Sequence, residues 1–483
     1  MQLDPSLKAD KPAALSMGVG MAGRAISIVV EAAAAIIVAR LLLPRELGVL
    51  ATAIAIATLV SLVLTMQIDA QAARSTDGSW AAQALPWALL AGLAVIVLLV
   101  AVAAVFTYSG AGTTALVLVW YLPAAALAPV TALLTGMLRA RGRVHAAVGL
   151  PMSTSALRLL LILVVAFVWD LEAIHVAAAN SLSAAITLLV AFAISKRDLG
   201  RVQPATTTTL TSIVQAGIPL VMMAATWLML QRTDVVVLSL IRGAGTAGRY
   251  VVALRPAEVL IELYGAAQIM FIPTVVAFRN RAASRDVYKK SLFLVSAIMA
   301  PLIVAYAFWA DVLVAWVFGS EYVLSPLVYV PIAGWVYIHI MTGPSGYLLI
   351  AEHRNSILIK TGLVTVVFNL MLNLLLIPSL GAFGAALATL GAFAIMNGSY
   401  LWGLRNFLQP VSIHSRYLQW LIVLTLMMLV IHSLTRVLFP PSVGLAVVAT
   451  FVGLGVALFM ARLNSSFREA WSASSSGTIR RIG

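Results

Sequence analysis

Residues 26–68 read ISIVVEAAAAIIVARLLLPRELGVLATAIAIATLVSLVLTMQI. This stretch belongs to two predicted spans, 14–43 and 46–68, which meet at a tight turn around Pro44. Each span exceeds the about 20 mostly apolar residues that a membrane-spanning helix needs. We therefore expect an all-α polytopic membrane protein with about 14 transmembrane helices. The twelve further predicted spans are 81–107, 113–138, 144–169, 171–194, 210–241, 246–278, 287–310, 323–350, 355–377, 381–404, 417–438 and 442–461.

The composition of the whole chain agrees with this pattern. Of the 483 residues, 62% are hydrophobic and 10% are charged, whereas an ordinary soluble domain has about 45–50% and about 25%. The chain therefore has too little polar surface for a water-soluble globule of this size. It has no cysteine, which excludes disulfides, thiolate zinc sites and cysteine nucleophiles.

The basic residues orient the predicted spans. Short cytoplasmic loops of membrane proteins are enriched in Lys and Arg. With a cytoplasmic N-terminus, most Lys and Arg residues fall in cytoplasmic segments, and the opposite loops hold only Arg40, Arg45, Arg242, Arg249 and Arg436. This bias predicts that both termini are cytoplasmic. These cytoplasmic Lys and Arg residues also make up most of the net charge of +14, and anionic lipid attracts such basic loops. Because the membrane explains the basic charge, we expect no nucleic-acid partner.

Two matches indicate an internal repeat, the first of them at an offset of 200 residues. Residues 39–49 fall opposite residues 239–249, and a second match joins 143–158 with 354–369. We expect two homologous six-helix lobes, the arrangement in which transporters form a site at the lobe interface. The predicted segments are a cytoplasmic N-terminal segment (1–12), an N-lobe (13–194), a cytoplasmic linker (195–209), a C-lobe (210–405), two further spans (406–463) and a cytoplasmic basic tail (464–483).

Nine charged side chains lie well inside the predicted spans. On a lipid-facing surface each costs roughly 2.5–3.5 kcal/mol at a helix centre. We therefore expect most of them to face a protein interior or a wet cavity. The nine residues are Arg24, Glu31, Arg158, Arg232, Asp234, Arg255, Glu258, Glu262 and Lys360.

Two interpretations compete for these groups. In the first, acids and bases pair to lock helices together, and residues near span ends extend to the headgroups; we favour it for Arg232, Asp234 and Lys360. In the second, a hydrated, net-basic cavity accepts an anionic headgroup, because the planar donors of arginine bind two phosphate oxygens at once. We favour the second for the other six residues. Asn369 and Asn373 share a face of the eleventh span and are secondary candidates.

Motifs for catalysis, nucleotides or metals are weak or missing in the sequence. Gly243, Gly245 and Gly248 match the letters of a dinucleotide-binding fingerprint, but that motif needs a soluble βαβ unit around it, and here it is a short turn between two spans. The six histidines show no metal-ligand spacing, and the carboxylates outside the spans are scattered over short loops. We expect neither an enzyme nor a bound cofactor or metal.

Several segments are similar to those of bacterial polysaccharide-export flippases. The turn Ala39–Ala51 resembles the turn after their first helix, and Val317–Tyr322 resembles the segment after their ninth. The run from His353 to Pro378, followed by Gly381–Thr389, resembles their eleventh and twelfth helices. The stretch Gln67–Arg74 departs from the family pattern, because it lacks a glycine after the aspartate.

This resemblance implies the multidrug/oligosaccharidyl-lipid/polysaccharide flippase fold, with two six-helix lobes and alternating access. In its polysaccharide branch the substrate is an undecaprenyl-diphosphate-linked sugar repeat, moved from the inner to the outer leaflet of the bacterial inner membrane. Polymerase and chain-length or export proteins are the implied partners. The lipid II branch has cavity arginines on the first and eighth helices, where Arg24 and Arg255 lie here.

Our hypothesis is a flippase for an isoprenoid-diphosphate-linked oligosaccharide. Arg24, Arg158 and Arg255 would bind the diphosphate, and Glu31, Glu258 or Glu262 would line the cavity or carry protons. The alternatives are a small-molecule or drug antiporter of the same superfamily, a lipid II flippase, a membrane-embedded glycan polymerase or ligase, and a non-transporting partner in a glycan-export complex.

Overall fold

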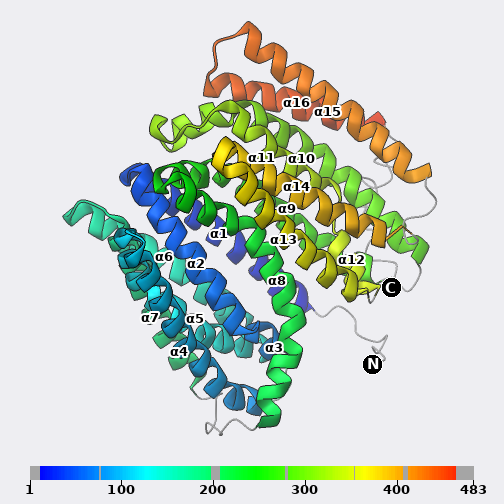
Figure 1. The fold of residues 1–483 in the computed structure, drawn as a ribbon. Coiled ribbons are helices and arrows are strands. Elements are labelled where there is room, and N and C mark those ends of the chain that lie inside the picture. The colour runs from blue at the N-terminus through cyan, green and yellow to red at the C-terminus, as the bar shows by residue number, and fades with distance from the viewer. Residues whose placement is uncertain are drawn as a thin grey trace. The chain divides into compact units, whose positions relative to one another are not determined.

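The computed structural model describes residues 11–74, 78–196, 207–277, 281–352, 354–405 and 412–463. These residues form sixteen α-helices and one 3₁₀ helix, with no strand among them (Figure 1). The prediction of an all-α membrane protein is confirmed. The elements are α1 (Lys11–Leu41), α2 (Pro44–Thr65), α3 (Ile68–Arg74), α4 (Gly78–Tyr108), α5 (Gly112–Ala140), α6 (Val144–Val168), α7 (Ala173–Ser195), α8 (Thr207–Arg242), α9 (Ala244–Ala277), α10 (Arg281–Val317), η1 (Ser320–Tyr322), α11 (Pro326–Met341), α12 (Ser345–Ala351), α13 (Asn355–Leu380), α14 (Ala382–Gly403), α15 (Ser412–Leu438) and α16 (Val443–Leu463).

Within the described residues, ten helices are long and apolar enough to cross a membrane. Shorter apolar helices lie at Pro326–Met341 and Val443–Leu458. Each of the predicted spans overlaps a helix of the structure, because long apolar runs can satisfy their backbone hydrogen bonds in lipid only as helices. The ten helices are α2, α4, α5, α6, α7, α8, α10, α13, α14 and α15.

Two predicted spans end or divide differently from the expectation. The span 323–350 forms two helices, α11 and α12, because Gly343 adopts a φ of 66° and Pro344 has no N–H for a helical hydrogen bond. The span 46–68 ends at Thr65. Met66 and Gln67 then adopt left-handed φ angles of 50° and 51°, which a helix does not allow, and the short helix α3 follows.

The chain divides into two compact units, unit 1 (residues 1–229) and unit 2 (residues 230–483). The boundary falls inside α8. The predicted linker 195–209 lies mostly outside the described residues, as do most of the predicted N-terminal segment and the whole of the predicted tail 464–483.

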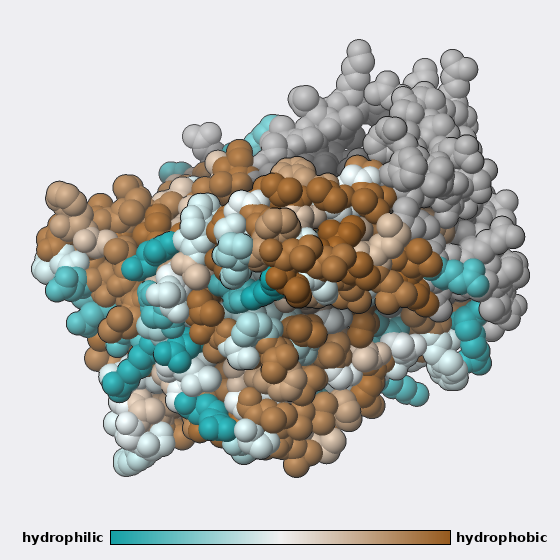
Figure 2. Space-filling view, turned by 90° about the horizontal axis from the view of Figure 1, so that it is seen from above, coloured by the Kyte–Doolittle hydropathy of each residue, from teal (hydrophilic) through white to brown (hydrophobic). Residues whose placement is uncertain are grey.

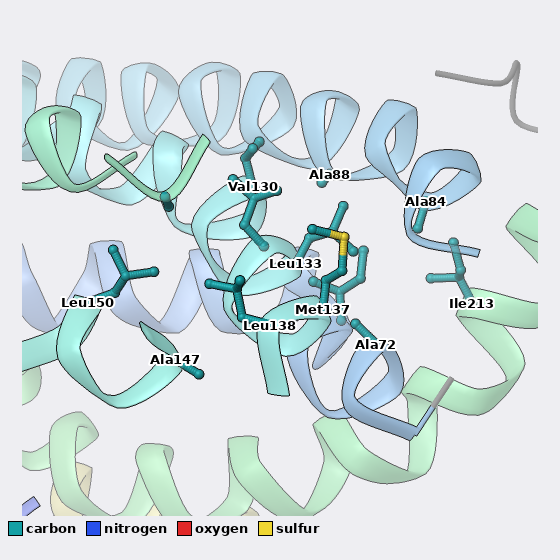
Figure 3. Close-up of a cluster of buried hydrophobic side chains, with 13 residues drawn as sticks. Ala72, Ala84, Ala88, Val130, Leu133, Met137, Leu138, Ala147, Leu150 and Ile213 are labelled. Carbon is teal, nitrogen blue, oxygen red and sulfur yellow. The ribbon is translucent and has the colours of Figure 1, made fainter. Parts of the chain in front are cut away.

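In unit 1, α5 packs against α2, α3, α4 and α7. Near the end of α5, Leu133, Leu134, Met137 and Leu138 are buried in an apolar cluster with side chains from α3, α4, α6, α7 and the start of α8 (Figure 3). Gly136 allows the closest approach: a Cβ added there would lie 2.4 Å from the carbonyl oxygen of Asp69. The backbone of α3 is therefore seated directly on α5.

Unit 2 repeats the helix neighbours of unit 1. The pairs α4–α5, α6–α7, α5–α7, α2–α5 and α2–α4 in unit 1 correspond to α10–α11, α13–α14, α11–α14, α9–α11 and α9–α10 in unit 2. This correspondence supports the predicted internal repeat. The last two helices, α15 and α16, lie outside the repeat and pack on α10.

Polar contacts fix α15 to α10. The indole nitrogen of Trp309 donates to Nδ1 of His432 at 3.0 Å. One turn further along α15, the guanidinium of Arg436 binds both carboxylate oxygens of Asp311. The C-terminal helices are thus attached to the repeat by specific side chains as well as by apolar packing.

Arg242, the last residue of α8, ties this helix to the end of α13. Its guanidinium donates to the carbonyl oxygens of Ile377, Pro378 and Ser379. The shortest of these hydrogen bonds joins Nη2 to the carbonyl oxygen of Pro378 at 2.8 Å. The last carbonyls of a helix have no intrahelical donor, and a cation near them is stabilising. Arg242 supplies both the donors and the charge.

Large apolar side chains are exposed along many helices. On α13 they include Leu363, Val364, Val367 and Leu375. Figure 2 shows such hydrophobic side chains, in brown, across the face in view. Because apolar area in water costs about 25 cal/mol per Å², this surface is that of a protein surrounded by hydrocarbon.

Candidate functional site

Three charged side chains meet between α8 and α9 in unit 2. Glu258 accepts from Arg255 Nη1 at 2.7 Å with one carboxylate oxygen and from Arg232 Nη1 at 3.4 Å with the other. Arg255 and Glu258 share a helix face at i,i+3 spacing, whereas Arg232 comes from the neighbouring helix. The side chains of Arg232, Glu258 and Arg255 keep 27%, 23% and 36% of their surface exposed. We call these three residues the arginine–glutamate triad.

The depth of the triad follows from the helix hairpin. α8 and α9 meet at Gly243, and Arg232 and Arg255 lie eleven and twelve residues from it along the two helices. At about 1.5 Å per residue, both lie about 16–18 Å from the turn along their helices, roughly half of the about 30 Å thickness of a hydrocarbon layer, so we expect them near the middle of the bilayer. The triad itself has two arginines and one carboxylate, and two further acids adjoin it: Asp234, which interacts with Arg232, and Glu262, which follows Glu258 at i+4.

Asp234 forms a separate, buried centre in unit 2. Its Oδ2 accepts from Tyr250 Oη on α9 at 2.8 Å and from Thr389 Oγ1 on α14 at 3.4 Å. Its Oδ1 accepts from the backbone N–H of Val235 at 2.8 Å. The carboxylate therefore joins three helices through neutral donors. Arg232 is the residue that pairs with an acid of another helix, Glu258.

The remaining acid on α9 lies one turn beyond the triad. Glu262 is half-buried and follows Glu258 at i+4. A separate hydrogen bond joins α9 to α10 in the same unit: the hydroxyl of Tyr306 on α10 donates to the carbonyl oxygen of Ala253 on α9 at 2.7 Å.

In unit 1, polar side chains connect α1, α6 and α7. Ser155 on α6 donates to Glu31 Oε1 on α1 at 3.1 Å. Arg158, one turn further along α6, donates to Asn180 Oδ1 on α7 at 3.5 Å. Glu31 is exposed and Arg158 is half-buried. The structure thus places the predicted residues Glu31 and Arg158 on the joined faces of neighbouring helices.

Arg24 is described only through its backbone in α1, so its predicted contacts lie outside the described side chains. It precedes Glu31 by seven residues, which is two helical turns, so the two positions share one face. That Arg24, Arg158 and Arg255 bind one ligand remains a prediction.

The secondary candidates on α13 differ from one another. Lys360 is exposed. Asn369 and Asn373 are buried, and Asn373 Nδ2 donates to Asn369 Oδ1 at 3.0 Å. Within the described part of the chain, Asn369 Nδ2, Asn373 Oδ1 and the hydroxyl of Thr365 have no hydrogen-bond partner. These three residues recur every four positions and form a polar stripe on one buried helix face.

Sequence reasoning missed the neutral partners of these groups, which are Ser155, Asn180, Tyr250 and Thr389. One signal was available for Tyr250. It lies seven residues after the hairpin turn at Gly243, and Asp234 lies nine residues before it, so the two have similar depths on adjacent helices. In the residues that the structure covers, no three His, Asp or Glu side chains gather into a group that could hold a metal ion.

Comparisons with known proteins give a family match and a fold match. The model of the family described as "Polysaccharide biosynthesis protein" matches residues 13–278. A probable low-salt glycan biosynthesis flippase, Agl15 of Haloferax volcanii, is 28% identical over 205 residues, which cover 40% of this chain and 42% of the relative. The match thus spans less than half the length of that curated relative.

Two solved structures share the fold. The lipid II flippase MurJ in an inward closed conformation has a TM-score of 0.73 at 12% identity, with 93% of this chain and 98% of that chain covered. An inward-facing multidrug resistance transporter of the MATE family has a TM-score of 0.61 at 15% identity, with 83% and 99% covered. At these identities the likeness concerns the fold alone.

Proposed function

Because the chain belongs to the polysaccharide biosynthesis protein family, we propose that it is a flippase that moves an undecaprenyl-diphosphate-linked oligosaccharide across the membrane. The family membership confirms the resemblance predicted from the sequence. The substrate and the direction of transport belong to the proposal. So do a location in the bacterial inner membrane with both termini cytoplasmic, and cooperation with polymerase and chain-length or export proteins.

The arginine–glutamate triad is the observation that carries this proposal. Isolated charges at bilayer depth are costly, and those that occur in transport proteins commonly mark substrate or ion pathways. The triad brings two arginines together, and arginine donors match the geometry of phosphate oxygens. A diphosphate headgroup is the anion that a lipid-linked oligosaccharide brings to this depth.

Both units contain candidate arginines for the diphosphate. Unit 2 offers Arg232 and Arg255, and unit 1 offers Arg158, with Arg24 on the face of α1 that also holds Glu31. In the proposed cycle the diphosphate binds these arginines, the prenyl tail stays in lipid, and alternating access carries the sugars across. The membrane potential, or proton exchange at Glu31, Glu258 or Glu262, supplies the energy. The chain performs no covalent chemistry in this cycle.

The test is gene deletion followed by complementation. Deletion is expected to make a lipid-linked glycan accumulate on the cytoplasmic side, and mass spectrometry of that glycan identifies the substrate. Variants R158Q and R255Q are expected to block glycan export at unchanged protein levels. R405Q is a matched control, because Arg405 is exposed and lies over the Trp402 ring.

The outcomes separate the alternative functions. Accumulation of lipid II would favour lipid II flipping, and drug sensitivity without glycan accumulation would favour the drug antiporter. Glycosyl transfer by the purified chain would favour the enzyme. Normal export in both R158Q and R255Q would remove the arginines from the site.

A further inference from the structure

Arg158 in unit 1 has a neutral partner, whereas the arginines of the triad in unit 2 have an acid. Arg232 and Arg255 contact Glu258 at 3.4 Å and 2.7 Å. Within the described residues, the Arg158 guanidinium makes no ion pair, and its hydrogen bond runs to Asn180 Oδ1 at 3.5 Å. A guanidinium has five N–H donors. Most donors of Arg158 therefore have no protein acceptor in the part of the chain that the structure describes.

The acid on the neighbouring helix α1 binds elsewhere. Glu31 Oε1 accepts from the hydroxyl of Ser155 at 3.1 Å, and Ser155 lies one turn before Arg158 on α6. Among the described side chains, Glu31 and Arg158 form no ion pair. The two opposite charges attract each other across this turn, but the carboxylate does not occupy the donors of the guanidinium.

Asn180 is oriented with its carbonyl oxygen toward Arg158. Its Nδ2 donates to the carbonyl oxygen of Val176, one turn earlier on α7, at 2.8 Å. Because the donor and the acceptor of an amide are different atoms, this hydrogen bond leaves Oδ1 for the guanidinium. An aspartate has nearly the same shape as asparagine, but its carboxylate would form an ion pair with Arg158. Asn180 thus directs the guanidinium without neutralising its charge.

The internal repeat indicates that the fold does not require an arginine at this position. The match of 143–158 with 354–369 places Arg158 opposite Asn369. Asn369 is buried and neutral and accepts from Asn373 at 3.0 Å, and α13 packs on α14 as α6 packs on α7. The same helix pair therefore forms in unit 2 without the charge. Because an ionised side chain inside a membrane-spanning helix is costly and commonly marks a substrate or ion pathway, we assign the charge of Arg158 to ligand binding.

We propose that Asn180 is a positioning residue for the anionic headgroup of the substrate, because it orients the Arg158 guanidinium and leaves it able to bind phosphate. The planar donors of Arg158 bind phosphate oxygens when the substrate enters, and the neutral amide does not compete with them as a carboxylate would. This inference rests on the proposed function and deepens it by assigning the residue that keeps Arg158 available.

The test measures the binding of undecaprenyl diphosphate to the full chain in phosphatidylcholine nanodiscs, together with thermal unfolding. In N180D the new carboxylate pairs with Arg158, so the affinity is expected to fall about tenfold or more, because the phosphate has to displace a charged acceptor. N180A removes the orienting group but adds no competing charge, so its affinity is expected to fall less. N180D is expected to unfold at no lower temperature than N180A, because it keeps a partner for Arg158.

The order of the two variants separates positioning from a structural role. If Asn180 only held α6 and α7 together, N180A would lose at least as much affinity as N180D, and that result would overturn the inference. Wild-type affinity in N180D would overturn it as well. T187V is the matched control, because Thr187 contacts Thr154 between the same two helices at 2.8 Å, and it is expected to bind the probe as the wild type does.

Two further results concern the proposed function itself. R158Q is expected to weaken binding of the same probe, and unchanged binding in R158Q would remove Arg158, and with it Asn180, from the site. If the wild-type protein does not bind undecaprenyl diphosphate, the proposed function fails, whatever the order of the Asn180 variants.

Discussion

The hydrogen bond from Tyr250 to Asp234 can be tested with a matched pair of substitutions. Tyr250 and Tyr306 are both buried in unit 2, at 0% and 5% exposure, and each hydroxyl donates one short hydrogen bond. Tyr250 donates to the carboxylate of Asp234 at 2.8 Å, whereas Tyr306 donates to the backbone carbonyl of Ala253 at 2.7 Å. Y250F and Y306F thus remove the same atom from similar surroundings and differ in the charge of the acceptor.

The expected magnitudes follow from that difference. A hydrogen bond to a charged group contributes about 1.5–3 kcal/mol, and a neutral one about 0.5–1.5 kcal/mol. Asp234 keeps its contacts with Val235 and Thr389 in Y250F, so the carboxylate stays partly satisfied. We expect Y250F to lower the free energy of unfolding by about 1 kcal/mol more than Y306F does.

The assay is equilibrium unfolding of the purified protein in mixed micelles, followed by tryptophan fluorescence. The double variant Y250F/D234N shows whether the two residues are coupled, because the loss from Y250F is expected to shrink when the carboxylate has already been removed. Equal losses in Y250F and Y306F would show that Asp234 carries no charge in the folded protein, and the reasoning from its ionised carboxylate would be wrong.

Three further predictions concern packing, pairing and topology. G136A is expected to destabilise the protein by about 1–3 kcal/mol in thermal unfolding, because the added Cβ would lie 2.4 Å from the Asp69 carbonyl oxygen. G149A is the control, because a Cβ added at Gly149 would have no atom within 4 Å. Equal stability of the two variants would contradict the close packing of α3 on α5. A double-mutant cycle of D311N, R436Q and the double variant is expected to show a coupling energy of about 0.5–3 kcal/mol in the same assay. If the losses of stability in the two single variants simply add up in the double variant, the Asp311–Arg436 pair does not hold α15. Because the chain has no cysteine, Y108C and R141C can be labelled singly in cells: a membrane-impermeant thiol reagent is expected to reach Y108C from outside and R141C only after the membrane is opened, and the reverse pattern would overturn the predicted orientation.

Much of the fold could be predicted because hydrocarbon restricts the choices of the backbone. An apolar run long enough to cross a bilayer has to be helical, so the predicted spans overlap the observed helices. The interruptions were harder to see. Gly343 and Pro344 are breakers of regular structure, but they lie within a long apolar run, and the left-handed turn at Met66 and Gln67 contains no glycine at all.

The site was predicted less completely, because the sequence shows which groups are costly in lipid but not which helices are neighbours. The i,i+3 contact of Arg255 with Glu258 follows from helical periodicity alone. The contact of Arg232 with Glu258 requires knowing that α8 and α9 face each other at that depth. Ser155 and Asn180 carry no charge, so the cost argument that singled out Glu31 and Arg158 could not find their partners.

The cap that Arg242 forms on α13 has a mechanical consequence. The side chain of Arg242, at the end of α8, binds three carbonyl oxygens at the end of α13, so we expect the ends of these two helices to move together. A rearrangement that tilts α8 near this tip therefore drags α13 with it. We therefore expect any bending of α8 to occur before Arg242, because its last residue is bound to the end of α13.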